Sequence, residues 1–328
     1  MKKIRIFVMI LVFIFGLLSL NIFAASTITL NFGHMGTTDT AYHEVALFMA
    51  ERVNELTNGE INIVVYPNAE LGDEQDLFEQ LMQGITDFAI VAPGVTVEFA
   101  PTMNFFNFPF LFETQEEWEH VLTSDIAATI QERVKNESDV LILGYVGGGE
   151  RYVVSNKPIK EMKDFNNFLM RVQPSPVDVD TWSSLGVKPT VVNYSEIYSA
   201  LQLGVVDGLE NEPEWILRMK FYEQAPYLVK TAHKIVTRPL VMSNMTFEKL
   251  SEEHQEAILE AGKEASALGR ELGIKLDSES LEILKDKYGV TVFDADISKI
   301  KELTSDVIEK NAEALGVYDL IQEVEKMK

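Results

Sequence analysis

The segment Leu201-Gln202-Leu203-Gly204-Val205-Val206-Asp207 repeats the pattern of an earlier segment, Leu81-Met82-Gln83-Gly84-Ile85-Thr86-Asp87. Both read leucine, two variable residues, glycine, an aliphatic residue, one variable residue and aspartate. This order is typical of a helix that ends at a glycine and is followed by a strand. A chance match between two such units is one interpretation. The other is that the chain contains two similarly wound halves that face one cleft.

Strands and helices alternate around these segments. The first part of the chain predicts strands at 27–32, 61–66 and 88–91, and helices at 40–57 and 72–82. A second series of strands is predicted at 141–146, 151–155, 168–172, 190–192 and 205–206. The alternation predicts an α/β fold in which each half is a mixed, mostly parallel sheet flanked by helices.

Roughly 300 residues follow the apolar N-terminal stretch, which is long for a single hydrophobic core and sufficient for two lobes. We expect lobe I to comprise residues 26–148 plus 237–276 and lobe II to comprise residues 149–236 plus 277–328, with a ligand cleft between them. Apolar residues at helical spacing from 251 to 287 predict one helix about 55 Å long, which spans both lobes. Three glycines weaken this helix by up to about 1 kcal/mol each, so a break within it is an alternative.

The N-terminus has the regions of a secretory signal peptide. Basic residues at positions 2, 3 and 5 precede an uncharged apolar run over 6–20, and Ala24 and Ala25 offer a cleavage site. We predict a cleaved signal peptide at residues 1–25. A retained membrane anchor is the alternative, because the apolar stretch is about long enough to span a bilayer.

The chain has no cysteine. This excludes disulfides, thiolate metal sites and a lipid-modified cysteine that would tether the exported protein to a membrane. An exported chain without a tether, and without stable membrane insertion after cleavage, fits the periplasm.

The chain is strongly acidic, with 51 Asp and Glu residues against 28 Lys and Arg residues. Such a surface argues against nucleic acid and anionic lipid as partners. It repels anionic ligands at long range, but salt screens this repulsion beyond roughly 8 Å at physiological ionic strength. An arginine in a cleft can therefore still bind an anion.

Arg171 and Arg151 are the candidates for such an anion site. Arg171 stands in a strand-like run between Met170 and Val172, where burial of a guanidinium requires an anionic partner. For each arginine the partner is either a protein carboxylate, which an acidic chain supplies easily, or the carboxylate of a ligand. The residue types alone do not decide between a structural ion pair and a ligand site.

The sequence contains no recognisable catalytic or metal-binding motif. The histidines lack metal-ligand spacing, no Gly-x-Ser-x-Gly motif is present, and the glycines at 147–149 lack the spacing of a phosphate-binding loop. We therefore expect no catalytic residue, no metal and no cofactor. His34 follows the first strand and is either a cleft residue or a structural loop histidine. Tyr194 and Trp215 are candidates for the wall of a ligand site.

Several motifs resemble the substrate-binding protein of TRAP transporters (tripartite ATP-independent periplasmic transporters, C4-dicarboxylate-binding type). The most specific stretch runs from Arg171-Val172-Gln173-Pro174-Ser175 to Asp207-Gly208-Leu209-Glu210-Asn211. Segments 66–73, 108–112 and 149–159 are also similar to that family. The resemblance covers essentially the whole chain after the signal and implies the two-lobe periplasmic binding protein fold.

The resemblance also implies the ligand-binding residues. The arginine that matches Arg171 clamps the ligand carboxylate with two parallel hydrogen bonds, which a planar guanidinium provides and a lysine does not. Further polar contacts and cleft-lining residues are implied at Arg151, Asn211, Glu74, Tyr194, His34 and Trp215.

The chain departs from the family pattern at two places. Asn167 replaces the usual glycine four residues before the arginine, and asparagine can still adopt a left-handed turn. Relatives that bind sialic acid carry a glutamate where this chain has Val91-Ala92-Pro93. This difference disfavours sialic acid and favours a smaller or less hydroxylated acid.

Together these features predict the periplasmic solute-binding subunit of a TRAP transporter, which is not an enzyme. It would capture an organic acid anion, close by hinge motion and deliver the anion to the small and large TRAP membrane subunits. A binding protein of the same fold that serves a sensor or an ABC-type permease is the alternative, and a secreted hydrolase is a third class. C4-dicarboxylates, 2-oxo acids and sugar acids all remain open as ligands.

Overall fold

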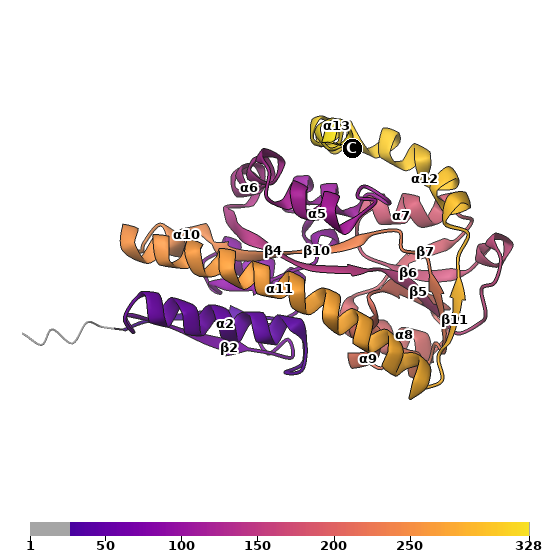
Figure 1. Ribbon diagram of the computed structural model, residues 1–328, viewed down its shortest axis with the longest axis horizontal. Coiled ribbons are helices and arrows are strands. Elements are labelled where there is room, and N and C mark those ends of the chain that lie inside the picture. Colours follow the sequence, from indigo (N-terminus) through magenta and orange to yellow (C-terminus); the bar gives the residue numbers. More distant parts are fainter. Residues whose placement is uncertain (1–26, 328) are drawn as a thin grey trace, which may run out of the picture.

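The computed structural model describes residues 27–327, which form two lobes that are each built on one β-sheet (Figure 1). The predicted signal peptide, residues 1–25, lies outside the described residues. Within residues 27–327 no helix combines the length and the apolar character that a membrane span requires. The predicted two-lobed α/β architecture is confirmed.

The first lobe contains a five-stranded sheet in the order β2-β1-β3-β10-β4. β1 is parallel to β2 and β3, whereas β10 lies antiparallel between β3 and β4. The strands are β1 (Ile28–Gly33), β2 (Ile61–Tyr66), β3 (Phe88–Ile90), β4 (Val140–Glu150) and β10 (Ile235–Ser243). The helices are α2 (Ala41–Leu56), α3 (Glu74–Met82), α4 (Pro93–Thr96), η1 (Pro101–Asn107), α5 (Gln115–Leu122), α6 (Asp125–Ser138) and α10 (Asn244–Phe247).

The second lobe contains a six-stranded sheet in the order β11-β9-β5-β8-β6-β7. Only β5 is antiparallel to its neighbours among these strands, so both sheets are mixed and mostly parallel, as predicted. The strands are β5 (Tyr152–Ser155), β6 (Leu169–Val172), β7 (Lys188–Val191), β8 (Gly208–Asn211), β9 (Tyr227–Lys230) and β11 (Thr291–Asp294). The helices are η2 (Met162–Phe165), α7 (Pro176–Ser184), η3 (Tyr194–Glu196), α8 (Ile197–Gln202), α9 (Pro213–Arg218) and η4 (Phe221–Glu223).

The two repeated segments occupy equivalent places in the two lobes. The helices α3 and α8 are followed by Gly84 and Gly204, which have left-handed φ angles of 67° and 70°. Asp87 then accepts a hydrogen bond from a backbone N–H of β1 at 2.7 Å, and Asp207 accepts one from a backbone N–H of β6 at 3.0 Å. The shared contact supports two similarly wound halves rather than a chance match.

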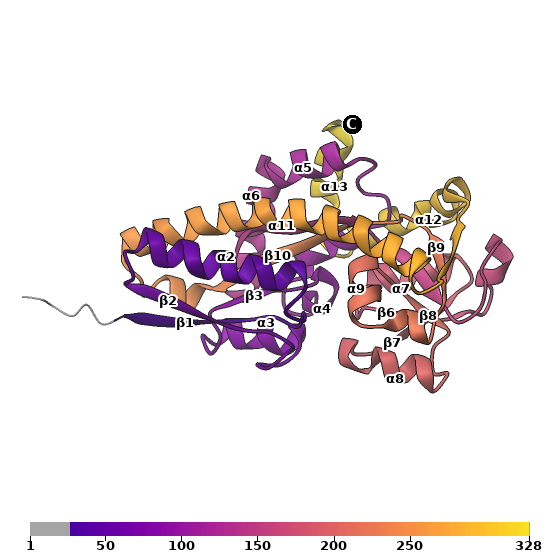
Figure 2. The ribbon, with the colours of Figure 1, turned by 60° about the horizontal axis from the view of Figure 1, so that its bottom comes forward.

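The long helix α11 (Glu252–Asp286) is continuous and runs along both lobes (Figures 1 and 2). Ile258 and Ala265 pack in the core of the first lobe, and Leu284 packs in the core of the second. A Cβ at Gly273 would lie 2.4 Å from the carbonyl oxygen of Gly147 in β4. Glycine therefore lets helix and strand approach closely, and the alternative of a break within the helix does not occur because this contact compensates for low helix propensity.

The C-terminal helices α12 (Ile297–Ala312) and α13 (Tyr318–Met327) contact both lobes. Ile300 packs in the core of the second lobe, whereas Leu320 and Val324 pack in the core of the first. The proposed lobe boundaries, 26–148 plus 237–276 and 149–236 plus 277–328, stay a prediction.

We expect Gly273→Ala to lower the free energy of unfolding by about 1–3 kcal/mol, because the added Cβ does not fit against the backbone of β4. Helix propensity alone predicts the opposite sign, a gain of about 1 kcal/mol. Urea unfolding followed by circular dichroism measures the change. Ser278→Ala, at an exposed position of the same helix, is the matched control. A variant at least as stable as the parent would show that the close contact is not needed.

Candidate functional site

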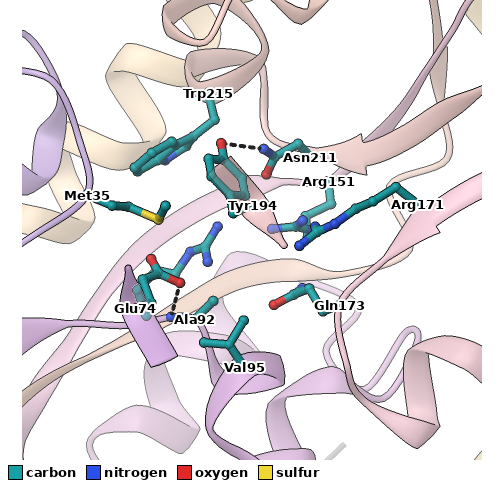
Figure 3. Close-up of a pocket in the computed structure, with 11 residues that line it drawn as sticks. Met35, Glu74, Ala92, Val95, Arg151, Arg171, Gln173, Tyr194, Asn211 and Trp215 are labelled. Carbon is teal, nitrogen blue, oxygen red and sulfur yellow. Dashed lines mark hydrogen bonds between the residues drawn. The ribbon is translucent and has the colours of Figure 1, made fainter. Parts of the chain in front are cut away.

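A narrow cavity lies between the two lobes (Figure 3), with about 310 Å³ of space between its lining atoms when the adjoining open solvent is included. The first lobe lines the cavity with Met35, Glu74, Ala92, Val95 and Arg238, and the second lobe lines it with Arg171, Gln173, Tyr194, Asn211 and Trp215, while Arg151 follows the end of β4. Six of the seven predicted site residues are thus brought together, and His34 is not among the lining residues.

Arg171 lies in β6 and is 2% exposed. Its Nε donates a hydrogen bond to the carbonyl oxygen of Val192 at 3.0 Å, and its guanidinium carbon lies 5.7 Å from the ring centroid of Tyr194. Within residues 27–327 no carboxylate lies within 4.0 Å of this guanidinium, and its two terminal nitrogens have no hydrogen-bond partner. Arg171 therefore presents an open guanidinium fork to the cavity.

The pKa of Arg171 reflects this lack of a carboxylate partner. Burial lowers the pKa to about 10, and the positive charge of Arg151 acts in the same direction, while Glu210 opposes the shift. The guanidinium is still charged at neutral pH, because the pKa lies well above 7. A ligand carboxylate would supply the missing counter-charge.

Arg151 has the opposite surroundings, although it is buried to a similar extent. Its Nε and Nη2 donate to the carboxylate of Glu210, and its Nη1 donates to Glu212 at 2.8 Å. Burial alone would raise the pKa of Glu210, but Arg151 and Lys234 hold it well below its usual range. The structural ion pair that the sequence left open is present at Arg151, and its role as a ligand contact stays a prediction.

Five residues that line the cavity were not among the predicted site residues, and two of them, Arg238 and Gln173, carry polar side chains. Arg238 in β10 donates from Nη2 to Glu212 at 2.6 Å, so Glu212 bridges two arginines. Gln173 is 4% exposed, and its Oε1 has no hydrogen-bond partner within the described part of the chain. The sequence pattern that pointed to Arg171 could also have identified Arg238, because Arg238 is a basic residue within the largely apolar run 235–242.

Glu74 is the first residue of α3 and faces the cavity from the first lobe. Its Oε2 accepts a hydrogen bond from the backbone N–H of Ala92 at 2.9 Å, and its Oε1 accepts one from the hydroxyl of Tyr42 at 3.4 Å. Burial raises the pKa of Glu74, and the charge of Arg238 opposes this shift. The side chain offers hydrogen-bond acceptors on the wall opposite Arg171 (Figure 3).

An aromatic wall and an amide complete the cavity. Trp215 forms T-shaped ring contacts with Tyr42 and Tyr194, with ring centroids 4.9 Å and 5.7 Å apart. Asn211 donates from Nδ2 to the hydroxyl of Tyr194 at 3.2 Å, whereas its Oδ1 has no partner among residues 27–327. The amide oxygen is therefore a free acceptor beside the aromatic wall.

His34 is completely buried at the end of β1. Its Nε2 lies 3.2 Å from Nδ1 of His43, and burial, followed by the charge of His43, lowers the pKa of His34 to about 4. This histidine is therefore neutral at physiological pH. Its role in ligand binding stays a prediction.

The arrangement can bind an anion. It combines Arg171, a cation without a counter-charge in the described part of the chain, with several hydrogen-bond acceptors that line the same cavity. Within residues 27–327 no group of three or more His, Cys, Asp or Glu side chains is placed to hold a metal ion.

The chain is similar in sequence to bacterial solute-binding proteins. Residues 32–314 match the model of the family "Bacterial extracellular solute-binding protein, family 7" (DctP). A solute-binding protein of Sulfitobacter sp. strain NAS-14.1 is 37% identical over 276 residues, which are 84% of each chain.

Solved structures are similar over nearly their whole length. A TRAP periplasmic solute-binding protein of Sulfitobacter sp. NAS-14.1 with bound α-D-taluronate has a TM-score of 0.88 and 35% identity, over 92% of this chain and 98% of that one. One from Roseobacter denitrificans with bound L-galactonate has a TM-score of 0.82 and 30% identity, over 86% and 94% of the two chains.

The two arginines are expected to respond differently to removal in the ligand-free protein. Arg151→Met should lower the free energy of unfolding by about 3–5 kcal/mol, because Glu210 and Glu212 lose a buried partner. Arg171→Met should leave stability unchanged or raise it, because it removes a buried charge without a counter-charge. Chemical unfolding of both variants measures the difference. Equal destabilisation by the two substitutions would contradict the assignment of Arg171 as unpaired.

Proposed function

This chain belongs to family 7 of the bacterial extracellular solute-binding proteins, the periplasmic binding proteins of TRAP transporters, and from this premise we propose that it captures a sugar acid by its carboxylate. The family binds solutes and is not enzymatic. The bound uronate and aldonate of the two relatives described above support the ligand class.

The single observation that carries the proposal is the open fork of Arg171. A planar guanidinium binds a carboxylate through two parallel N–H···O hydrogen bonds. Because Val192 accepts only from Nε, both terminal nitrogens remain available for an anion. The cost of burying this arginine is offset when a ligand carboxylate occupies the cavity.

The other polar groups favour a hydroxylated acid over a dicarboxylate. Gln173 and Asn211 each present a buried amide oxygen without a partner in the described chain, and Glu74 adds a carboxylate. Such acceptors match the hydroxyl donors of a sugar acid. The second carboxylate of a C4-dicarboxylate would instead add acceptors and would meet the charge of Glu74.

We further propose that the captured acid is delivered to the small and large TRAP membrane subunits. Family membership supports this partnership and a periplasmic location. Export through a cleaved signal peptide at residues 1–25 is part of the same proposal. Service to a sensor or an ABC-type permease remains the alternative, and neighbouring genes for the two membrane subunits would favour TRAP transport.

We expect Arg171→Ala to weaken sugar-acid binding by about 2–5 kcal/mol, because a desolvated charge pair is lost. This corresponds to a roughly 30- to several-thousand-fold increase in Kd. Isothermal titration calorimetry with L-galactonate and D-glucuronate measures the change. Arg171→Lys is the matched control: it keeps the charge but loses the fork, so it should not restore affinity. Unchanged affinity in a folded Arg171→Ala variant would contradict the clamp.

A ligand series tests the acceptor wall. The parent protein should bind L-galactonate more tightly than galactarate, the diacid with the same carbon skeleton, because the second carboxylate meets Glu74. Glu74→Gln should narrow or reverse this preference, since the amide removes the negative charge and adds a donor. Calorimetry with both ligands, and with malate and 2-oxoglutarate as comparison acids, measures the ratio. Tightest binding of malate would show that the ligand is a C4-dicarboxylate.

A further inference from the structure

A second group of buried acidic side chains, Glu214 and Asp277, lies where α9 meets the beginning of α2. Glu214, in the first turn of α9, is 3% exposed, and its Oε1 accepts a hydrogen bond from the backbone N–H of Ala41 at 2.9 Å. Ala41 is the first residue of the 16-residue helix α2, and the side chain of Thr40 does not cap that helix. Glu214 thus supplies the acceptor that the helix N-terminus lacks.

This hydrogen bond connects the two lobes, and it lies next to a residue that lines the ligand cavity. Ile216 and Leu217 hold α9 in the core of the second lobe, whereas α2 packs in the core of the first. Trp215, the neighbour of Glu214 in α9, lines the cavity. The position of this cavity wall therefore depends on how α9 is held against α2.

Charged groups surround Glu214 on all the elements that pack against it. Asp277 of α11 accepts a hydrogen bond from the backbone N–H of Glu214 at 2.9 Å. Arg218 of α9 forms a partly exposed ion pair of 2.8 Å with Asp39, just before α2. Glu212 precedes α9 and is held by two arginines.

These surroundings favour the neutral form of the buried acids. Burial raises the pKa of Glu214 to about 7, and the charges of Glu212 and Asp39 add to the shift, while the Ala41 N–H and Arg218 oppose it. Burial, followed by the charge of Glu212, also raises the pKa of Asp277 well above its usual range. A protonated carboxyl group keeps its carbonyl oxygen, so it can still accept the bond from Ala41.

We propose that Glu214 is a positioning residue that takes up a proton when the lobes close, and that ligand affinity therefore depends on pH through this side chain. The affinity part rests on the proposed function. When the lobes separate, α2 leaves α9, and water reaches the carboxylate, so its pKa returns towards 4.5. The closed form then binds more protons than the open form between pH 4.5 and about 7. Closure is favoured at low pH, and this advantage is lost as the pH rises through about 7.

Calorimetry of L-galactonate binding at several pH values tests the proposal. The change in the pKa of Glu214, from 4.5 in the open form to about 7 in the closed form, sets the size of the effect. Glu214 should make binding about tenfold tighter at pH 6 than at pH 8, and about half a proton should be taken up per ligand at pH 7. Buffers with different enthalpies of ionisation measure the uptake. Glu214→Gln should remove this contribution, whereas Glu44→Gln, an exposed change in the first turn of α2, should not.

A Glu214→Gln variant with the same proton uptake and the same pH profile as the parent would overturn the proposal. If no sugar acid binds, the proposed function fails, and the ligand-free protein still tests Glu214. Spin labels at Glu51→Cys and Gln202→Cys, in a chain without other cysteines, report the distance between the lobes. A shift towards shorter distances from pH 8 to pH 5 that is lost in Glu214→Gln supports the proposal, and an identical response in both proteins contradicts it.

Discussion

The site depends on the burial of a positive charge without a protein counter-charge. Arg151, Arg238 and Lys234 are buried near the cavity and pair with carboxylates, whereas Arg171 is equally buried and has no carboxylate within 4.0 Å in residues 27–327. Desolvation of an unpaired guanidinium destabilises this arrangement of the lobes. In the proposed function an anionic ligand removes this cost, and closure of the lobes is thereby linked to binding.

The paired cations and the rigid frame keep this charge unpaired. Glu212 is shared between Arg151 and Arg238, so the nearest carboxylates already have partners. α11 packs closely on β4, which leads from the first lobe to the second. Arg151 follows directly after β4 and lines the site.

Much of the fold followed from local patterns in the sequence, because helix spacing, glycine caps and strand alternation are encoded over a few residues. The spanning helix and the repeated segments were predicted in this way. The difference between Arg151 and Arg171 was not predictable from composition, because it depends on Glu210 and Glu212, about sixty positions away. Asn167 was placed correctly in a left-handed turn, with φ of 61°, because that property is local.

The polar atoms of the cavity that lack a partner narrow the chemistry of the ligand. Motif matching found Asn211 and Glu74 beside the cations and aromatic residues, but it did not find Gln173 or Arg238. Within the described chain, the buried atoms without a partner in this lining are the amide oxygens of Gln173 and Asn211 and Nε of Arg238. An acceptor buried without a donor costs about 1–3 kcal/mol. A ligand with one carboxylate and several hydroxyl groups satisfies the fork and both amide oxygens, whereas a simple dicarboxylate leaves these oxygens without a donor. The polar atoms of the cavity therefore support the proposal of a sugar acid in addition to the relatives.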